Sequence, residues 1–304
     1  MSKKEIDWFA IFLLISAMMV WASSFIALKS AISSLGSMSV IFGRMLSASL
    51  IFIFFIKSFL KLNFSKEDIK YIAIMVFLEP CLYFIFEAKA LEYTSASQAG
   101  MLTSMMPLVT AIGAGFILKE KITKRLILGA LLAILGAIWL SFSTQSSNIA
   151  SNPILGNFLE FMAMICGAGY AISIRKLSEK FSALFLTAIQ SFAGAIFFFP
   201  FFLWEYNTQE IHFELNAILW TLYLGIVVTL GGYGLFNLAL SRVEASKASV
   251  YVNLIPVFTL LLAYLILGEK MKFVELIASA IILFGVIITQ IPERFLSYKI
   301  KAEK

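Results

Sequence analysis

The segment from residue 96 to residue 121, ASQAGMLTSMMPLVTAIGAGFILKEK, occurs a second time in altered form. Residues 245 to 270, ASKASVYVNLIPVFTLLLAYLILGEK, align with it without a gap at an offset of 149, and ten of the 26 aligned positions are identical. Shared apolar composition explains only a minority of these matches, so we infer that the chain consists of two duplicated halves. The matches include a proline, a glutamate and, beyond the segment, a glycine: Pro107 with Pro256, Glu120 with Glu269, and Gly136 with Gly285.

The composition predicts a membrane protein. Of the 304 residues, 61% are hydrophobic and 14% are charged, whereas a soluble domain has about 45 to 50% apolar and about 25% charged residues. A transmembrane helix needs roughly 20 apolar residues. Runs such as AIFFFPFFLW do not alternate as outer-membrane strands do. We expect ten spanning helices, at 8–30, 38–56, 70–90, 95–118, 125–142, 154–174, 182–203, 217–240, 246–267 and 273–291.

The two halves, residues 1–145 and 146–304, each contain five of the expected helices. An odd number of spans places the second copy in the membrane upside down relative to the first. Inverted repeats of this kind are typical of secondary transporters, whose substrate site lies near the bilayer midplane between the repeats. The expected fold class is therefore an all-α polytopic membrane protein of two inverted five-helix repeats.

Basic residues predict the orientation, because lysine and arginine are retained on the cytoplasmic side. With the N-terminus inside, all but five of the 24 lysine and arginine residues fall in cytoplasmic segments. Both termini are then cytoplasmic, and the first apolar segment is a spanning helix and not a cleaved signal peptide. Topology accounts for the net charge of +6, so we expect membrane lipids and no nucleic acid as partners. The five exceptions are Arg44, inside a helix, and Lys29, Lys89, Lys270 and Lys272.

Catalytic and metal-binding patterns are absent from the sequence. Cys81 and Cys166 fall in different expected helices, and the single histidine, His212, lies in an expected outside loop. We therefore expect no metal, no cofactor and no enzymatic activity.

The best candidate site lies in LEPCLYFIFEAKALEY, residues 78–93. Glu79, Tyr83 and Glu87 follow one another at intervals of four, which predicts that they share one helix face. A carboxylate near the bilayer centre is costly, and such residues often mark substrate or proton paths. A carboxyl that merely stabilises the bundle is the alternative. Pro80 removes a backbone donor and predicts a bend suited to a gate.

The second half supplies counterparts to these residues. In TLGGYGLFNLAL, Tyr233 corresponds to Tyr83 and Asn237 to Glu87 at an offset of 150. Ser104 and Asn253 are matched in the same way, each three residues before one of the paired prolines Pro107 and Pro256. We expect both prolines to act at gating bends. For Arg44 we favour a structural role between helices. The other expected lining residues are Met101, Ser104, Tyr251, Asn253, Trp21, Ser24 and Tyr170.

The whole chain resembles the ten-helix EamA-like branch of the drug/metabolite transporters. The resemblance is carried by WASSFIALKSA (21–31), FGRMLSASL (42–50), the paired alanine-rich helix starts, and the closing LKEK and LGEK, with Ala22 in place of the family's usual glycine. It implies export or exchange of small organic solutes through a cavity built mainly from helices 1, 3, 4, 6, 8 and 9.

We therefore expect a secondary transporter of the plasma (inner) membrane that works by alternating access and is either linked to protons or driven by exchange. Two acids among aromatic residues suit an amino acid or an amine. A flippase for lipid-linked substrates shares the fold and is the alternative. A monomer and a homodimer are both compatible with the sequence.

Overall fold

The computed structural model describes residues 7–59, 62–117, 124–143, 150–178, 180–240 and 251–290, and this part of the chain contains helices and no strand. Short 3₁₀ or π-helical segments (η) join several α-helices. The elements are α1 (Trp8–Leu35), α2 (Ser37–Phe52), η1 (Ile53–Phe55), α3 (Ile56–Phe59), α4 (Lys66–Val76), η2 (Phe77–Leu82), α5 (Tyr83–Tyr93), α6 (Ala96–Leu102), η3 (Thr103–Met105), α7 (Met106–Ile117), α8 (Lys124–Ser143), α9 (Pro153–Leu177), α10 (Ala183–Thr208), α11 (Leu215–Tyr223), η4 (Leu224–Gly232), α12 (Tyr233–Leu240), α14 (Leu254–Leu262), η5 (Ala263–Leu267) and α15 (Phe273–Gln290).

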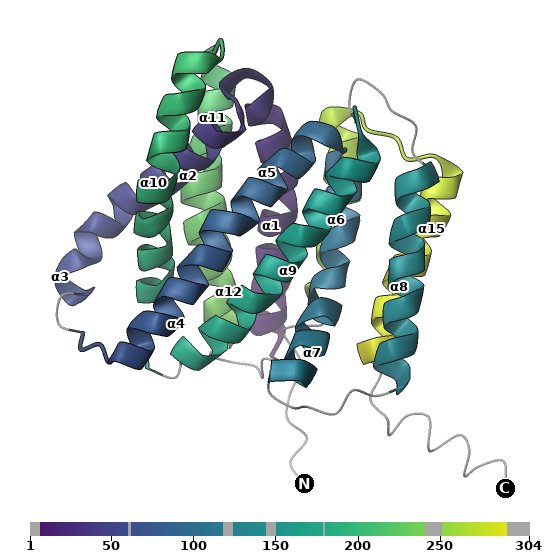
Figure 1. Cartoon of the computed structure of the whole chain (residues 1–304), viewed down its shortest axis with the longest axis horizontal. Coiled ribbons are helices and arrows are strands. Elements are labelled where there is room, and N and C mark those ends of the chain that lie inside the picture. The colour runs from purple at the N-terminus through teal and green to yellow at the C-terminus, as the bar shows by residue number, and fades with distance from the viewer. Residues whose placement is uncertain are drawn as a thin grey trace, which may run out of the picture.

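The helices run up and down in one bundle (Figure 1). We call the end that holds the turn at Gly36, between α1 and α2, the upper end, and the end at which α1 begins at Trp8 the lower end. Helix α5 ends and α9 begins at the upper end, so these two neighbours are antiparallel.

Six helical stretches of the described chain are long and apolar enough to cross a membrane: Trp8–Leu35, Ser37–Phe59, Lys66–Tyr93, Pro153–Ile174, Ala183–Thr208 and Leu215–Phe236. Three shorter apolar helices are Ile127–Leu140, Leu254–Leu267 and Phe273–Ile288. Each falls on a span expected from the sequence. The span expected at 95–118 is divided into α6, η3 and α7 in the residues described.

The outer surface of the bundle is apolar. The side chains of Phe54, Ile196 and Phe142 are 86%, 76% and 71% exposed. In water such a surface would be unfavourable, whereas hydrocarbon solvates it without cost.

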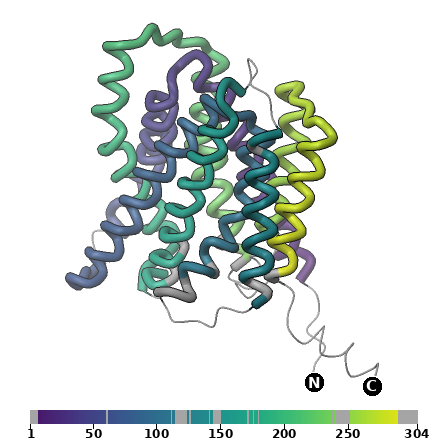
Figure 2. The backbone as a smooth tube through the Cα atoms, turned by 45° about the vertical axis from the view of Figure 1, so that its right-hand side comes forward, coloured from purple at the N-terminus to yellow at the C-terminus, as the bar shows by residue number. Residues whose placement is uncertain are grey.

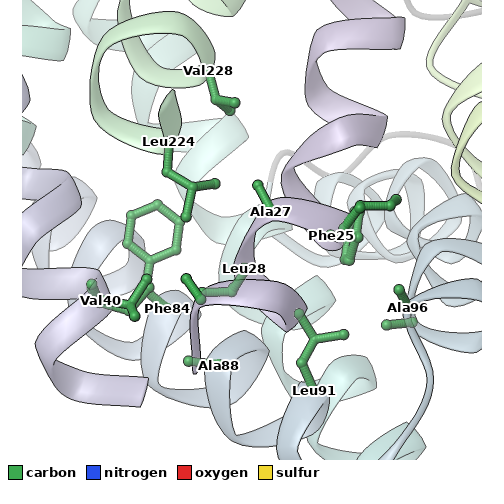
Figure 3. Packing of buried hydrophobic residues seen from close by; sticks show 14 of the residues in the cluster. Phe25, Ala27, Leu28, Val40, Phe84, Ala88, Leu91, Ala96, Leu224 and Val228 are labelled. Atoms are coloured by element: carbon green, nitrogen blue, oxygen red, sulfur yellow. The ribbon is translucent and has the colours of Figure 1, made fainter. Parts of the chain in front are cut away.

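Helix α1 packs at the centre of the largest core cluster. Its small residues Ala17, Ala22, Ala27 and Ala31 are fully buried and allow close approach of neighbouring helices, as in other membrane bundles. Figure 3 shows how α1 contributes to this core beside α2, α5, α6 and η4, through Phe25, Ala27, Leu28, Val40, Phe84, Ala88, Leu91, Ala96, Leu224 and Val228.

Helices α8 and α15 form a tight pair at one edge of the bundle, visible at the right of Figure 2. A Cβ atom on Gly136 would lie 2.8 Å from Ile282, and one on Gly285 would lie 2.7 Å from the backbone nitrogen of Ala133. Each glycine therefore permits the other helix to approach. These are the two glycines that the sequence repeat aligns.

Two buried carboxylates cap helices at the upper end. Glu205 on α10 accepts hydrogen bonds from the backbone nitrogen and Oγ of Ser39 at 2.7 and 2.8 Å. The turn before Ser39 needs Gly36, which has a φ of 81° and leaves no room for a Cβ atom beside the Glu205 carboxylate. Glu269 accepts from the backbone nitrogens of Ala96 and Ser97 at 3.1 and 2.9 Å and from the Ser97 Oγ at 2.7 Å. A carboxylate is favourable there, since a helix N-terminus carries unsatisfied N–H groups and a partial positive charge.

Candidate functional site

Glu79 lies where the third long helix is interrupted. Within η2, Glu79 has extended backbone angles (φ −143°, ψ 116°), and Pro80 follows it. Proline removes a backbone donor and clashes with the preceding turn, so the interruption occurs where the sequence predicts a bend. The Glu79 side chain is buried, with 6% of its surface exposed.

The Glu79 carboxylate binds residues of the second half of the chain. Its Oε1 accepts a hydrogen bond from the Tyr233 hydroxyl on α12 at 2.9 Å and a longer one from the Gln190 amide nitrogen on α10 at 3.4 Å. The Tyr170 hydroxyl on α9 lies 3.5 Å from the Gln190 carbonyl oxygen. Four elements thus converge on one buried polar cluster, which we call the Glu79 cluster: Glu79, Gln190, Tyr170 and Tyr233.

Aromatic rings close one side of the Glu79 cluster. The Trp21 ring on α1 meets Tyr233 edge to face with centroids 5.3 Å apart, and it lies 5.1 Å from the Phe236 ring. Gly232 makes room for Trp21, because a Cβ atom there would lie 2.5 Å from the indole nitrogen. Trp21 and Tyr233, two of the expected lining residues, are thus in contact.

Tyr83 and Glu87 form a separate pair on α5. The Tyr83 hydroxyl donates to Glu87 Oε1 at 3.1 Å, and 4% of the Glu87 side chain is exposed. The expectation that Glu79, Tyr83 and Glu87 share one face of a continuous helix does not hold, because Glu79 lies outside helical geometry. The interruption directs Glu79 to α10 and α12 instead.

Arg44 on α2 is a buried cation near the two acids. Its Nε donates to Thr229 Oγ1 at 3.2 Å, and its guanidinium carbon lies 4.3 Å from the centre of the Phe84 ring. The arginine interacts electrostatically with both Glu79 and Glu87. Arg44 therefore combines contacts between helices, as the sequence suggests, with a charge directed at the candidate site.

The repeated segments have breaks at aligned positions. In the first copy, η3 (Thr103–Met105) separates α6 from α7, and Pro107 is the second residue of α7. In the second copy, residues 252 and 253 form a turn before α14, which contains Pro256. Both prolines thus stand just after a break, where the missing N–H costs little.

Two serines that we expected to line the site donate their hydroxyl hydrogen bonds to backbone carbonyls of the preceding turn. Ser104 is fully buried and donates to the Met101 carbonyl at 2.7 Å, and Ser24 donates to the Trp21 carbonyl at 2.6 Å. Met101 itself is 4% exposed. These contacts are those of serines and methionines that pack within a helix bundle.

The remaining expected residues lie around the same core. Tyr251 packs against the central cluster and against Leu13, Leu14 and Ala239. Asn253 is partly exposed at the break before α14. Asn237 belongs to α12, but its side chain is outside the described part of the structure.

Sequence reasoning missed Gln190 and Glu160. Each is a polar residue within an expected apolar span, the same signal that singled out Glu79. Glu160 on α9 is fully buried, and Gln190 is 4% exposed.

The cysteines and the histidine form no further site in the described part of the chain. Cys81 and Cys166 are free and buried, and the described residues contain no group of three potential metal ligands. The backbone nitrogen of His212 donates to the Ser34 carbonyl at 3.1 Å.

The apolar helices, the lipid-compatible surface and the buried polar cluster define an integral multi-pass membrane protein. The model of the EamA-like transporter family matches residues 8–142 and 154–291. The chain belongs to this family and is a membrane transporter.

Relatives have the same general description. The "Uncharacterized transporter YetK" of Bacillus subtilis is 28% identical over 234 residues, covering 76% of this chain and 70% of that protein. An "Uncharacterized transporter" of Archaeoglobus fulgidus is 27% identical over 280 residues, covering 91% of this chain and 96% of that protein. A solved chain described as "Crystal structure of protein" has a TM-score of 0.61 at 17% identity and covers 92% of this chain and 96% of its own length, a likeness in fold alone.

Proposed function

We propose that this transporter is a secondary active exporter or exchanger of small organic solutes, with amines and amino acids as its first candidate substrates. It works by alternating access between two halves, 1–145 and 146–304. Glu79 acts as the group that couples transport to protons. The proposal includes no enzymatic activity.

The hydrogen bond between Glu79 and Tyr233 carries this proposal. It joins a buried acid of the first half to a phenol of the second half at 2.9 Å. A charged carboxylate inside a membrane is stable only with partners, so its ionisation and the contact between halves depend on each other. A proton or a substrate cation at Glu79 would therefore change the relative stability of two arrangements of the halves.

Two inverted five-helix repeats, ten helices in all, are our proposed architecture. The aligned breaks at Thr103–Met105 and residues 252–253 support it. The reciprocal contacts of Gly136 and Gly285 also support it. Gly136 lies against Ala278 and Ile282, and Gly285 lies against Gly129 and Ala133, which are the aligned positions in the other copy.

The lower end is proposed to be cytoplasmic, in a plasma (inner) membrane. Exposed lysines lie at that end, where Lys176 pairs with Glu67 at 2.5 Å and Lys180 pairs with Asp68. The positive-inside rule favours this orientation.

The chemistry of the cluster favours cationic or aromatic solutes. The rings of Trp21, Tyr233 and Phe236 offer faces that attract ammonium groups, and Glu79 supplies negative charge beside them.

The test is uptake of candidate amines and amino acids into proteoliposomes with and without a pH gradient. Glu79→Gln retains the shape but cannot ionise, so it should lose gradient-driven accumulation while retaining exchange of substrate for substrate. Glu205→Gln is the control for a buried acid outside the cluster and should keep its pH response per folded protein. Full gradient-driven accumulation by Glu79→Gln would refute the coupling role.

A flippase for lipid-linked substrates is the second candidate. A groove open to the side of the bundle lies between α2, α10 and α11 and is lined by Phe42, Leu46, Phe202 and Thr221 among others. A lipid tail could occupy such a groove. Leu46→Trp would fill it and should abolish lipid translocation under this alternative, whereas the solute carrier should continue to transport.

A further inference from the structure

Glu160 is a buried acid without a visible structural task. It lies on α9, is fully buried, and neither carboxylate oxygen has a hydrogen-bond partner among the described residues. The second carboxylate oxygen of Glu87, Oε2, also has none. Buried polar groups are nearly always bonded, so unpaired ones call for a specific explanation.

The packing of α9 against α5 places Glu160 beside Glu87. Near the upper end, a Cβ atom on Gly156 would lie 2.9 Å from the Ala90 carbonyl, and further down one on Gly167 would lie 3.4 Å from the Tyr83 ring. Because α5 and α9 are antiparallel, four residues from Gly156 to Glu160 on α9 run alongside about the same length of α5, from Ala90 back to Glu87, which brings the two acids level. The two carboxyls interact electrostatically, and Tyr83 interacts with both.

The charges in this region do not balance. Three carboxyls are buried here, those of Glu79, Glu87 and Glu160. Arg44 interacts electrostatically with Glu79 and Glu87, whereas Glu160 interacts with Glu87. Lys29 on α1 is directed away, since its ammonium binds the carbonyls of Leu91 and Thr94 at the upper end. Lys89 on α5 pairs with Glu92 at 2.7 Å. Uncompensated buried charge is strongly unfavourable, so a carboxyl in the empty site holds a proton, and its ionised form needs positive charge from outside the protein.

We propose that Glu87 and Glu160, with the ring of Tyr83 beside them, bind the primary ammonium group of the transported solute. Three unpartnered oxygens, Glu87 Oε2 and both oxygens of Glu160, match the three N–H donors of an –NH₃⁺ group. The site is distinct from the Glu79 cluster in its contacts, since Glu79 accepts hydrogen bonds from Tyr233 and Gln190, whereas Glu87 accepts one from Tyr83. The inference rests on the proposed function and adds the residues that bind the ammonium group and the preference for a primary amine.

The first experiment measures binding to the full chain in lipid nanodiscs, without a gradient, by isothermal calorimetry. The probes are 2-phenylethylammonium, its N-trimethyl analogue, which keeps the charge and lacks donors, and neutral 2-phenylethanol. The wild type should bind the primary ammonium best. Glu160→Gln should weaken that binding by about tenfold or more, because it removes a buried charge-assisted acceptor. Glu205→Gln, the matched buried acid, should keep wild-type affinity per folded protein.

The second experiment separates this role from a structural one. If Glu160 only stabilised the fold, Glu160→Gln would lower the melting temperature of the empty protein. A ligand site instead leaves the Glu160 oxygens without partners in the empty state, so the same variant should melt no lower than the wild type while binding the amine more weakly.

Three outcomes would overturn the inference: no ammonium binding by the wild type, equal binding of the trimethyl analogue, or a lower melting temperature of Glu160→Gln. None of them bears on gradient coupling at Glu79, which has its own partners, Tyr233 and Gln190.

Discussion

Glu269 is predicted to hold the upper end of the transporter closed. Its carboxylate accepts three hydrogen bonds from Ala96 and Ser97, and 6% of the side chain is exposed. Beside it, Lys29 binds carbonyls at the end of α5, and Thr94 donates to Asn157 at 2.8 Å. The first half therefore meets the second half here at two places, Glu269 and Asn157 on α9.

The expected effect of Glu269→Gln on the equilibrium between the closed and open arrangements follows from the hydrogen bonds that are lost. Glu269→Gln removes the charge and leaves at least one donor of α6 poorly paired, which costs about 1.5–3 kcal/mol by the usual range for bonds to charged groups. If the bonds exist only in the closed arrangement, that energy corresponds to a roughly 10- to 150-fold shift toward the open one.

Cysteine reactivity measures this shift. Ala99→Cys introduces a thiol at a fully buried position of α6, and both native cysteines are buried. In detergent, a water-soluble maleimide should react at least about tenfold faster with Ala99→Cys when Glu269→Gln is also present. Glu92→Gln removes a partly exposed acid paired with Lys89 and should change the rate by less than about twofold, as weak surface pairs do. Equal reaction rates in all three proteins would refute the role of Glu269 in holding the upper end closed.

Cysteines in the 204–216 loop should react with an impermeant thiol reagent from outside cells, and cysteines at 119–124 should not; opposite labelling would reverse the proposed topology. Uptake into proteoliposomes should be impaired by Pro107→Ala and by Pro256→Ala, while membrane insertion stays intact, because each change removes a backbone constraint next to an aligned break. Unchanged uptake would mean that both prolines only pack within the bundle. Gly285→Ala should destabilise the protein by about 1–3 kcal/mol in a denaturation assay, since its Cβ atom would lie 2.7 Å from the Ala133 backbone and force α8 and α15 apart; unaltered stability would contradict the close approach.

Much of the fold could be predicted from sequence, because apolar length and duplication are strong local signals. The spans, the family and the breaks beside Pro107 and Pro256 follow from patterns in single segments. The partners of Glu79 could not be predicted in the same way, since Tyr233 and Gln190 come from distant elements. Helical spacing also failed at Glu79, where Pro80 ends the 3.6-residue period on which a shared face depends.

Glu160 shows a different limit. A lone acid in the apolar span at 154–174 is visible in the sequence, but its importance depends on what surrounds it. Only the packing of Gly156 and Gly167 against α5 brings Glu160 level with Glu87, and only then do its unpartnered oxygens indicate a binding site.

The duplicated tyrosines connect these observations. Tyr83 donates to Glu87 four residues along its own helix, whereas its counterpart Tyr233 reaches across to Glu79 in the other half. The second half has Asn237 where the first has Glu87, so it lacks the corresponding acid on its own helix. In the proposed two-repeat architecture, this difference leaves one phenol for a local pair and the other for a bond between the halves. In the proposed carrier, this asymmetry separates an ammonium site at Glu87 from a coupling site at Glu79, so substrate binding and proton binding can each act on the halves through a different contact.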